Sequence, residues 1–194
     1  MTRSIEFFFD VGSPASYLAW TQRHTLGAPV TLRPMLLGGV FKATGNASPV
    51  SVPAKGRWMM ADLQRWAARH GVPFRMNPHF PINTLTLMRG ATAMQRQDEA
   101  VLDRYLSLVF PAMWAEPRNL GDAVVLAALL AEGGFNGEAF QAAVSDAEVK
   151  AALVATTEEA VARGVFGAPT FFVGDEMHFG QDRLDFVREA AARG

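Results

Sequence analysis

The chain has 194 residues, of which 49% are hydrophobic, and its formal net charge is -1. This length suits one large domain or a core with an inserted subdomain, and the apolar content is sufficient to bury a core. The balanced charge argues against a broad basic face for nucleic acid and against a polybasic membrane patch. The chain has no cysteine, which excludes a disulfide framework and a zinc site built on thiolates. Any thiol chemistry therefore needs a thiol that the protein does not encode.

The N-terminal residues run directly into a strand-like segment, SIEFFFD, without the apolar region of a signal peptide. The longest apolar stretch, residues 123–131, is too short to span a bilayer. We therefore expect a soluble, cytoplasmic protein with no membrane partner.

The first part of the chain has the pattern of a strand-helix-strand unit. Residues 4–9 carry three aromatics and an isoleucine, which is typical of a strand. Ser13 is suited to cap a helix that starts at Pro14 and runs to about residue 26. Residues 30–37 predict a second strand that ends near Pro34. Such a crossover implies parallel pairing with a right-handed connection.

The middle of the chain is predominantly helical. Residues 38–53 are rich in Gly, Ser, Pro and Asn and predict a loop. Met59, Leu63 and Trp66 then share one face of a helix that ends near residues 70–71. An irregular segment is expected at residues 77–83, and the further helical patterns cover residues 83–97, 99–115, 122–132, 138–144 and 147–163.

The C-terminal part returns to strands. Residues 170–173 predict a strand, and a turn at residues 174–175 leads back through residues 177–179. Asp182 has the position of an N-cap for a last helix, with Asp185 three residues later. The whole pattern predicts an α/β fold in which a four-stranded mixed sheet is assembled from the two ends of the chain.

We assign residues 1–37 and 164–194 to the core, and residues 38–163 to a mainly helical insertion whose last helix, near 147–163, can also pack with the core.

Most common enzyme signatures are missing. The four histidines, His24, His70, His79 and His178, have no HExxH spacing and no obvious carboxylate partners, so we expect no metal site. The sequence also lacks a GxSxG elbow, a Walker loop and a GxGxxG motif.

Three short features each have a structural and a functional interpretation. Ser13 and Asp182 can serve only as helix caps, or the two helix N-termini can also hold anionic groups of a ligand. The segment at residues 167–170, GAPT, is by itself an ordinary turn that leads into a strand. In a four-stranded sheet of this kind, the three features converge at one edge.

Four longer segments resemble one family in the expected order. They are DVGSPASYLAW, TGNASPVSVPAKGRWMM, NPHFPINTLTLMRG and FGAPTFFVGDEMHFGQDRLDFV. With them the chain resembles the 2-hydroxychromene-2-carboxylate isomerases of the kappa-class glutathione transferase group, over nearly its whole length. The resemblance implies a thioredoxin-like fold with a large all-helical insertion, glutathione as the cofactor and a homodimer.

The resemblance also implies how the residues around the glutathione thiol act. Ser13 would donate a hydrogen bond to the sulfur. The Ala168 backbone, which precedes a cis Pro169, would pair with the cysteinyl group. Related disulfide oxidoreductases carry a cysteine motif at the place of Ser13, so this chain cannot cycle a disulfide of its own.

Four further residues are implied at the two ends of glutathione. Gln181 and Asp182 would hold the γ-glutamyl end. Asn46 and Lys55, nine residues apart, would hold the remainder, with Lys55 suited to a carboxylate.

The implied reaction is a cis-trans isomerisation of a small aromatic substrate. It interconverts 2-hydroxychromene-2-carboxylate and trans-o-hydroxybenzylidenepyruvate by reversible addition of the glutathione thiolate. Phe41, residues 77–81 and Trp114 could form apolar walls for the substrate, or they could be core residues. Two alternatives stay open: a kappa-like glutathione transferase that consumes glutathione, and a thioredoxin-fold binding module without catalysis.

Overall fold

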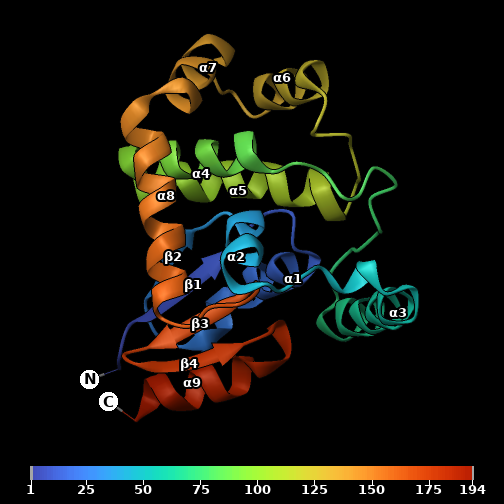
Figure 1. Cartoon of the computed structure of the whole chain (residues 1–194), viewed down its shortest axis with the longest axis vertical. Helices are drawn as coiled ribbons and strands as arrows, with labels where there is room; N and C mark the ends of the chain where they lie inside the picture. Colours follow the sequence, from blue (N-terminus) through green and yellow to red (C-terminus); the bar gives the residue numbers. More distant parts are fainter. Residues whose placement is uncertain (1, 194) are drawn as a thin grey trace.

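The computed structural model describes residues 2–193 and has a four-stranded sheet between helical layers (Figure 1). The strand order is β2-β1-β3-β4. β1 pairs parallel with β2 and antiparallel with β3, and β3 pairs antiparallel with β4. The sheet is therefore mixed and joins the two ends of the chain, as predicted. The strands are β1 (Ile5–Phe9), β2 (Val30–Pro34), β3 (Thr170–Val173) and β4 (Glu176–Phe179).

The helices follow the predicted order, and most of their boundaries agree within two residues. Helices α4 to α7 form the upper part of the molecule in Figure 1, α8 runs from there down beside the sheet, and α3 projects to one side. The α-helices are α1 (Pro14–Gln22), α2 (Leu37–Thr44), α3 (Pro53–His70), α4 (Leu85–Gln97), α5 (Glu99–Trp114), α6 (Ala123–Glu132), α7 (Gly137–Ser145), α8 (Ala147–Ala162) and α9 (Leu184–Ala192). Short 3-10 helices are η1 (Arg23–Leu26), η2 (Pro49–Ser51) and η3 (Gln181–Arg183). In the described part of the chain, no helix has the length and apolar character needed to cross a bilayer.

Successive side chains of the central strands point to opposite faces of the sheet, and both faces are buried by packing. On one face, Phe7 stacks on Phe171 with ring centroids 4.6 Å apart, and Phe9 packs against Phe110 of α5. On the other face, Phe8 and Phe172 belong to a second apolar cluster; its remaining members are Met35, Val40 of α2, Ala160 of α8 and Val165. The two faces thus fix α5 and α8 against the sheet from opposite sides.

Helix α2 begins at Leu37, the end of the predicted second strand, and continues into the predicted loop, so the loop prediction is wrong for residues 38–44. Two glycines near its start give it weak intrinsic helix propensity. Its first turn is instead held by tertiary bonds, because the Leu36 N–H donates to Thr157 Oγ1 and the Leu37 N–H donates to Asp10 Oδ2. Val40 packs in the cluster beneath the sheet face. Packing therefore overrides local propensity at this segment.

Helices α4, α5 and α7 meet around Gly90, and we expect Gly90→Ala to destabilise the protein by about 1–3 kcal/mol, the usual cost of overpacking. A Cβ at Gly90 would lie 2.6 Å from Phe140 Cε2 and 2.6 Å from the Tyr105 hydroxyl oxygen, and both of these side chains are buried. Urea unfolding measures the change. Gly137→Ala on α7 is the control, because its Cβ meets no atom within 4 Å. Equal stability of the two variants would contradict the packing argument.

Candidate functional site

Ser13 connects the start of α1 with the segment before β3. Its Oγ accepts from the Ser16 N–H at 3.1 Å, which confirms the predicted N-cap. The same hydroxyl donates to the Ala168 carbonyl at 2.9 Å and is only 5% exposed. A serine hydroxyl has one proton, so donating to a ligand requires it to turn away from Ala168.

The segment around Pro169 joins the site to the last helical region. The Ala168–Pro169 peptide bond is cis, as the family resemblance implied. The Pro169 carbonyl accepts from the Gly180 N–H at 3.0 Å. Through these bonds and the one from Ser13, the start of α1, the cis-proline segment and Gly180 meet at one place.

Gln181 and Asp182 follow Gly180 directly and form the 3-10 helix η3 with Arg183. Gln181 is 6% exposed, and its buried Oε1 has no hydrogen-bond partner among residues 2–193. Buried polar atoms are usually satisfied, because an unpaired acceptor costs free energy. Gln181 is therefore a polar group for which a ligand donor would supply the missing bond.

The prediction that Asp182 caps the last helix is wrong. Asp182 lies inside η3, whose N-cap is Gly180 with a φ of 104°. Its carboxylate instead pairs with the Arg183 guanidinium at 2.5 Å, and α9 begins at Leu184 without a side-chain cap. Asp182 lies one residue before Arg183, the N-cap of α9, and so does not occupy the capping position of that helix.

Asn46 lies next to the Pro169 segment, whereas Lys55 has no bond to it. Asn46 Nδ2 donates to the Phe166 carbonyl at 2.8 Å, and its Oδ1 accepts from the Ala47 N–H at 2.8 Å. Lys55 is exposed in the first turn of α3. Hydrogen bonds therefore connect Asn46, Ser13 and the cis-proline segment to each other, while Lys55 stands apart from them in the described chain.

Asp10 is a further residue at this site, and no motif in the sequence singled it out. Its Oδ1 accepts from the Gly12 N–H at 2.8 Å, and its Oδ2 accepts from the Leu37 N–H at 2.8 Å and from Thr84 Oγ1 at 3.1 Å. Its own carbonyl accepts from the Ser13 N–H. Asp10 is 1% exposed, so one buried carboxylate holds the Ser13 loop against the starts of α2 and α4.

Burial raises the pKa of Asp10 above its usual value, and the three hydrogen bonds only partly offset this effect. The sequence carries one signal of this role: an acidic residue directly follows an aromatic strand. An exposed turn gives the same pattern, so only the tertiary contacts distinguish the two.

The proposed aromatic walls differ in their surroundings. Trp114 is fully buried and donates from Nε1 to the Val11 carbonyl at 2.8 Å, so it is a core residue. Phe80 packs against the Trp114 ring with centroids 5.8 Å apart. Phe41 is half-buried on α2.

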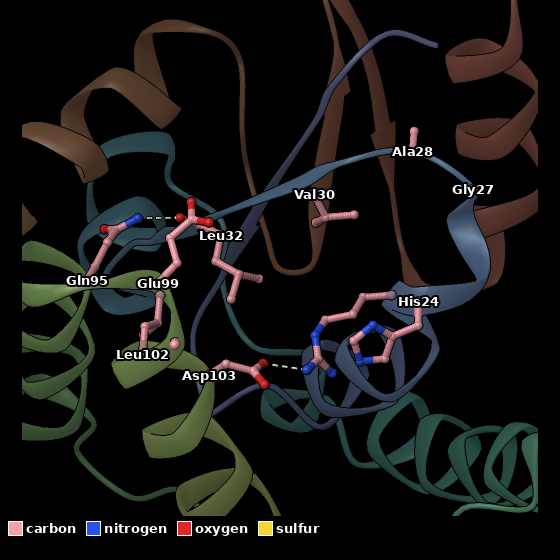
Figure 2. Close-up of a pocket in the computed structure, with 11 residues that line it drawn as sticks. His24, Gly27, Ala28, Val30, Leu32, Gln95, Glu99, Leu102 and Asp103 are labelled. Carbon is pink, nitrogen blue, oxygen red and sulfur yellow. Dashed lines mark hydrogen bonds and ion pairs between the residues drawn. The ribbon is translucent and has the colours of Figure 1, made fainter.

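A cavity of about 530 Å³ lies elsewhere, between η1, β2 and the adjoining ends of α4 and α5 (Figure 2). None of the seven predicted site residues lines it. Figure 2 shows its polar groups paired with each other: Gln95 Nε2 donates to the Leu32 carbonyl at 2.5 Å, and Arg23 pairs with Asp103. This cavity is therefore distinct from the candidate site.

We expect Asp10→Asn to cost stability by about 1–3 kcal/mol, because an amide has one acceptor oxygen and leaves a buried donor unpaired. The cost should shrink as pH rises. The raised pKa of Asp10 in the folded state means that folding binds a proton between the ordinary value, about 3.9, and the raised one. The contribution of Asp10 to the free energy of unfolding of the wild type is therefore complete at a pH below the ordinary pKa. It is lost as the pH rises to the pKa of the folded state.

Urea unfolding of both proteins from about pH 4 to about pH 8 spans the usual range for such a carboxyl. A stability difference that stays constant or grows across this range would contradict the raised pKa.

Comparisons with known proteins agree with the thioredoxin-like fold. Residues 4–192 match the DSBA-like thioredoxin domain family. The chain is 33% identical to "2-hydroxychromene-2-carboxylate isomerase" of Pseudomonas putida, covering 97% of this chain and 94% of that one. It is 27% identical to human "Glutathione S-transferase kappa 1", covering 96% of this chain and 90% of that one.

A solved structure of 2-hydroxychromene-2-carboxylate isomerase superposes with a TM-score of 0.85 at 29% identity, covering 98% of this chain and 95% of that one. These relatives are enzymes, isomerases and glutathione transferases. The chain belongs to the DSBA-like thioredoxin domain family, in the group formed by the 2-hydroxychromene-2-carboxylate isomerases and the kappa-class glutathione transferases.

Proposed function

We propose that this protein is a glutathione-dependent isomerase that interconverts 2-hydroxychromene-2-carboxylate and trans-o-hydroxybenzylidenepyruvate. The observation that carries the proposal is the direct bond between the Ser13 hydroxyl at the α1 N-terminus and Ala168, before a cis Pro169, in a chain without cysteine. A hydroxyl stands beside the cis-proline segment, and the thiol has to come from a ligand. The similarity to an isomerase of that name over nearly the full length supports the choice of reaction.

In the proposal, glutathione lies across the three joined segments. The Ala168 backbone pairs with the cysteinyl group, since a carbonyl that accepts from Ser13 still has a second lone pair. Gln181 and Asp182 hold the γ-glutamyl end, where the unpaired Gln181 oxygen supplies an acceptor for an ammonium. Asn46 and Lys55 hold the remainder, and Lys55 offers its charge to the glycyl carboxylate.

The reaction uses a borrowed nucleophile. The glutathione thiolate adds to the conjugated carbon-carbon double bond and forms a carbon-sulfur bond, while the electron pair moves to the carbonyl oxygen as an enolate. Rotation about the resulting single bond follows, and the enolate then expels the same thiolate, so glutathione is returned unchanged. The cis isomer closes to the chromene when its phenol oxygen adds to the ketone carbon and the phenol proton ends on the former ketone oxygen; the reverse opening supplies the conjugated ketone. The protein has to supply a low thiol pKa, for which the partial positive charge of the α1 N-terminus and the Ser13 hydroxyl are suited.

A cytoplasmic location and a homodimer are part of the proposal. The reaction requires reduced glutathione, which the cytosol maintains. The homodimer rests on the family resemblance alone.

The alternative function is a kappa-like glutathione transferase, favoured by the similarity to the human kappa enzyme. Both functions would use the same glutathione contacts. Product analysis with the hydroxybenzylidene pyruvate distinguishes them, because an isomerase leaves the glutathione concentration unchanged and a transferase lowers it. A binding module without catalysis would leave the thiol pKa unchanged on binding, which a titration of thiolate absorbance measures.

We expect Ser13→Ala to raise the pKa of the bound thiol by about one unit. A hydrogen bond to a charged acceptor contributes roughly 1.5–3 kcal/mol, which corresponds to about one to two units. Because the hydroxyl gives up its bond to Ala168 when it turns to the sulfur, we expect a pKa shift at the lower end of this range. The isomerisation rate at neutral pH should fall about tenfold, whereas the Kd of S-methylglutathione should barely change.

The control for Ser13→Ala is Asn136→Ala, which removes the side-chain cap of α7, far from α1 (Figure 1). Both variants should lose about 0.5–2 kcal/mol from the lost cap, but only Ser13→Ala should shift the thiol pKa. Full activity and an unshifted thiol in folded Ser13→Ala would leave Ser13 as a cap alone.

We expect Asp182→Ala to raise the Kd of glutathione about tenfold or more, because a charge-assisted hydrogen bond to the ligand ammonium is lost. Its stability should change little, since Asp182 caps no helix and its exposed pair with Arg183 is worth about 0–1 kcal/mol. Asp185→Ala, which breaks an exposed pair with Arg188 on α9, is the matched control. An unchanged Kd for Asp182→Ala in calorimetry would remove Asp182 from the site.

A further inference from the structure

Ser16 of α1 has a buried hydroxyl for which the fold provides no hydrogen-bond partner. The residue is 0% exposed, and its Oγ forms no hydrogen bond with any group of residues 2–193. Buried hydroxyls are usually paired, because an unpaired one loses its bonds to water and gains none in return. Unpaired buried groups of this kind can have a catalytic role, and Ser16 lies one turn after Ser13.

Ser16 has neither of the two structural roles that are usual for a serine in the first turn of a helix. It is the third residue after the cap Ser13, where a polar side chain can accept from the N–H of the cap residue. Here the Ser13 N–H donates to the Asp10 carbonyl at 3.0 Å instead. A serine in a helix can also donate to the carbonyl four residues earlier, which is that of Gly12. Among the described residues, the Ser16 hydroxyl forms neither bond.

The Ser13 hydroxyl is the group of the thiol site that lies next to this free hydroxyl. The Ser16 N–H already donates to Ser13 Oγ at 3.1 Å, so the two residues are held together. A serine oxygen has two lone pairs, and within the described chain the second lone pair of Ser13 Oγ accepts no bond. Side chains three residues apart are neighbours on a helix. A rotation of the Ser16 side chain about its Cα–Cβ bond can therefore bring its hydroxyl to Ser13 Oγ.

We propose that Ser16 is a positioning residue that acts through Ser13 when glutathione is bound. The Ser13 hydroxyl turns from Ala168 to the sulfur, and the Ser16 hydroxyl donates to Ser13 Oγ. A hydroxyl that accepts such a bond is a stronger donor, because hydrogen bonds in a chain polarise one another. The Ser16 hydroxyl thus gains in the complex the partner that it lacks in the free protein, and it stabilises the thiolate without touching it. This inference rests on the proposed glutathione-dependent function.

Ser16→Ala distinguishes this role from a structural one, because it removes only the hydroxyl. In a titration of thiolate absorbance, we expect the pKa of bound glutathione to rise by about 0.3–0.5 units, since a neighbouring bond strengthens a hydrogen bond by roughly 10–30%. The isomerisation rate at neutral pH should fall about two- to threefold, whereas the Kd of S-methylglutathione should stay the same. The urea midpoint should not fall, because the free protein loses no hydrogen bond.

The double variant Ser13→Ala/Ser16→Ala tests whether Ser16 acts through Ser13. Ser16→Ala should have no effect on the thiol pKa when residue 13 is already alanine, because the hydroxyl that transmits the effect is missing. Thr156→Val is the control for the loss of a hydroxyl. It removes a bond to the Ala152 carbonyl within α8 and should leave the thiol pKa unchanged.

The outcomes separate this inference from the function on which it rests. An unchanged thiol pKa in folded Ser16→Ala, or an equal shift in the Ser13→Ala background, would overturn the role of Ser16 and leave the proposed function in place. A lower urea midpoint with an unchanged thiol pKa would do the same and assign the hydroxyl to the Gly12 carbonyl. A wild-type complex whose thiol titrates like that of free glutathione would overturn both the role of Ser16 and the proposed function.

Discussion

A buried carboxylate has to find hydrogen-bond donors, and the donors available to Asp10 come from three different segments. They are the Gly12 N–H in the Ser13 loop, the Leu37 N–H at the start of α2, and the Thr84 hydroxyl before α4. The cost of an unsatisfied buried charge is high, so these segments cannot separate independently. Asp10 thereby ties the sheet, the helical region and the candidate site into one unit.

The Ser13 hydroxyl has two roles in the structure before any ligand binds. It caps α1 and bonds to Ala168, which holds the helix N-terminus beside the cis Pro169 segment. The position of the helix end is thereby preorganised, while the hydroxyl can turn its proton from the Ala168 carbonyl to the sulfur of the proposed ligand. In the proposed reaction, the fixed helix end and the turning hydroxyl share the stabilisation of the thiolate.

Helix α2 is held by tertiary bonds at both of its ends. Its start is bonded to Asp10 and Thr157, and the residue after its C-cap bonds to Phe166. A short helix with two glycines near its start has little stability of its own. Its position therefore depends on the bonds that its two ends make to Asp10, Thr157 and Phe166.

The sequence alone determined the strands, most of the helix order and the lack of a thiol in the chain itself, because periodicity, turn residues and the missing cysteine are local or compositional properties. The four family segments extended this to the thioredoxin-like fold and to Ser13, Ala168 and Pro169 at one place. The tertiary structure alone decided that α2 is a helix, that Asp182 is no cap and that Asp10 is buried. Asp10 bonds across 27 and 74 residues and Ser13 across 155, and such partners leave no trace in the local pattern that sequence analysis uses.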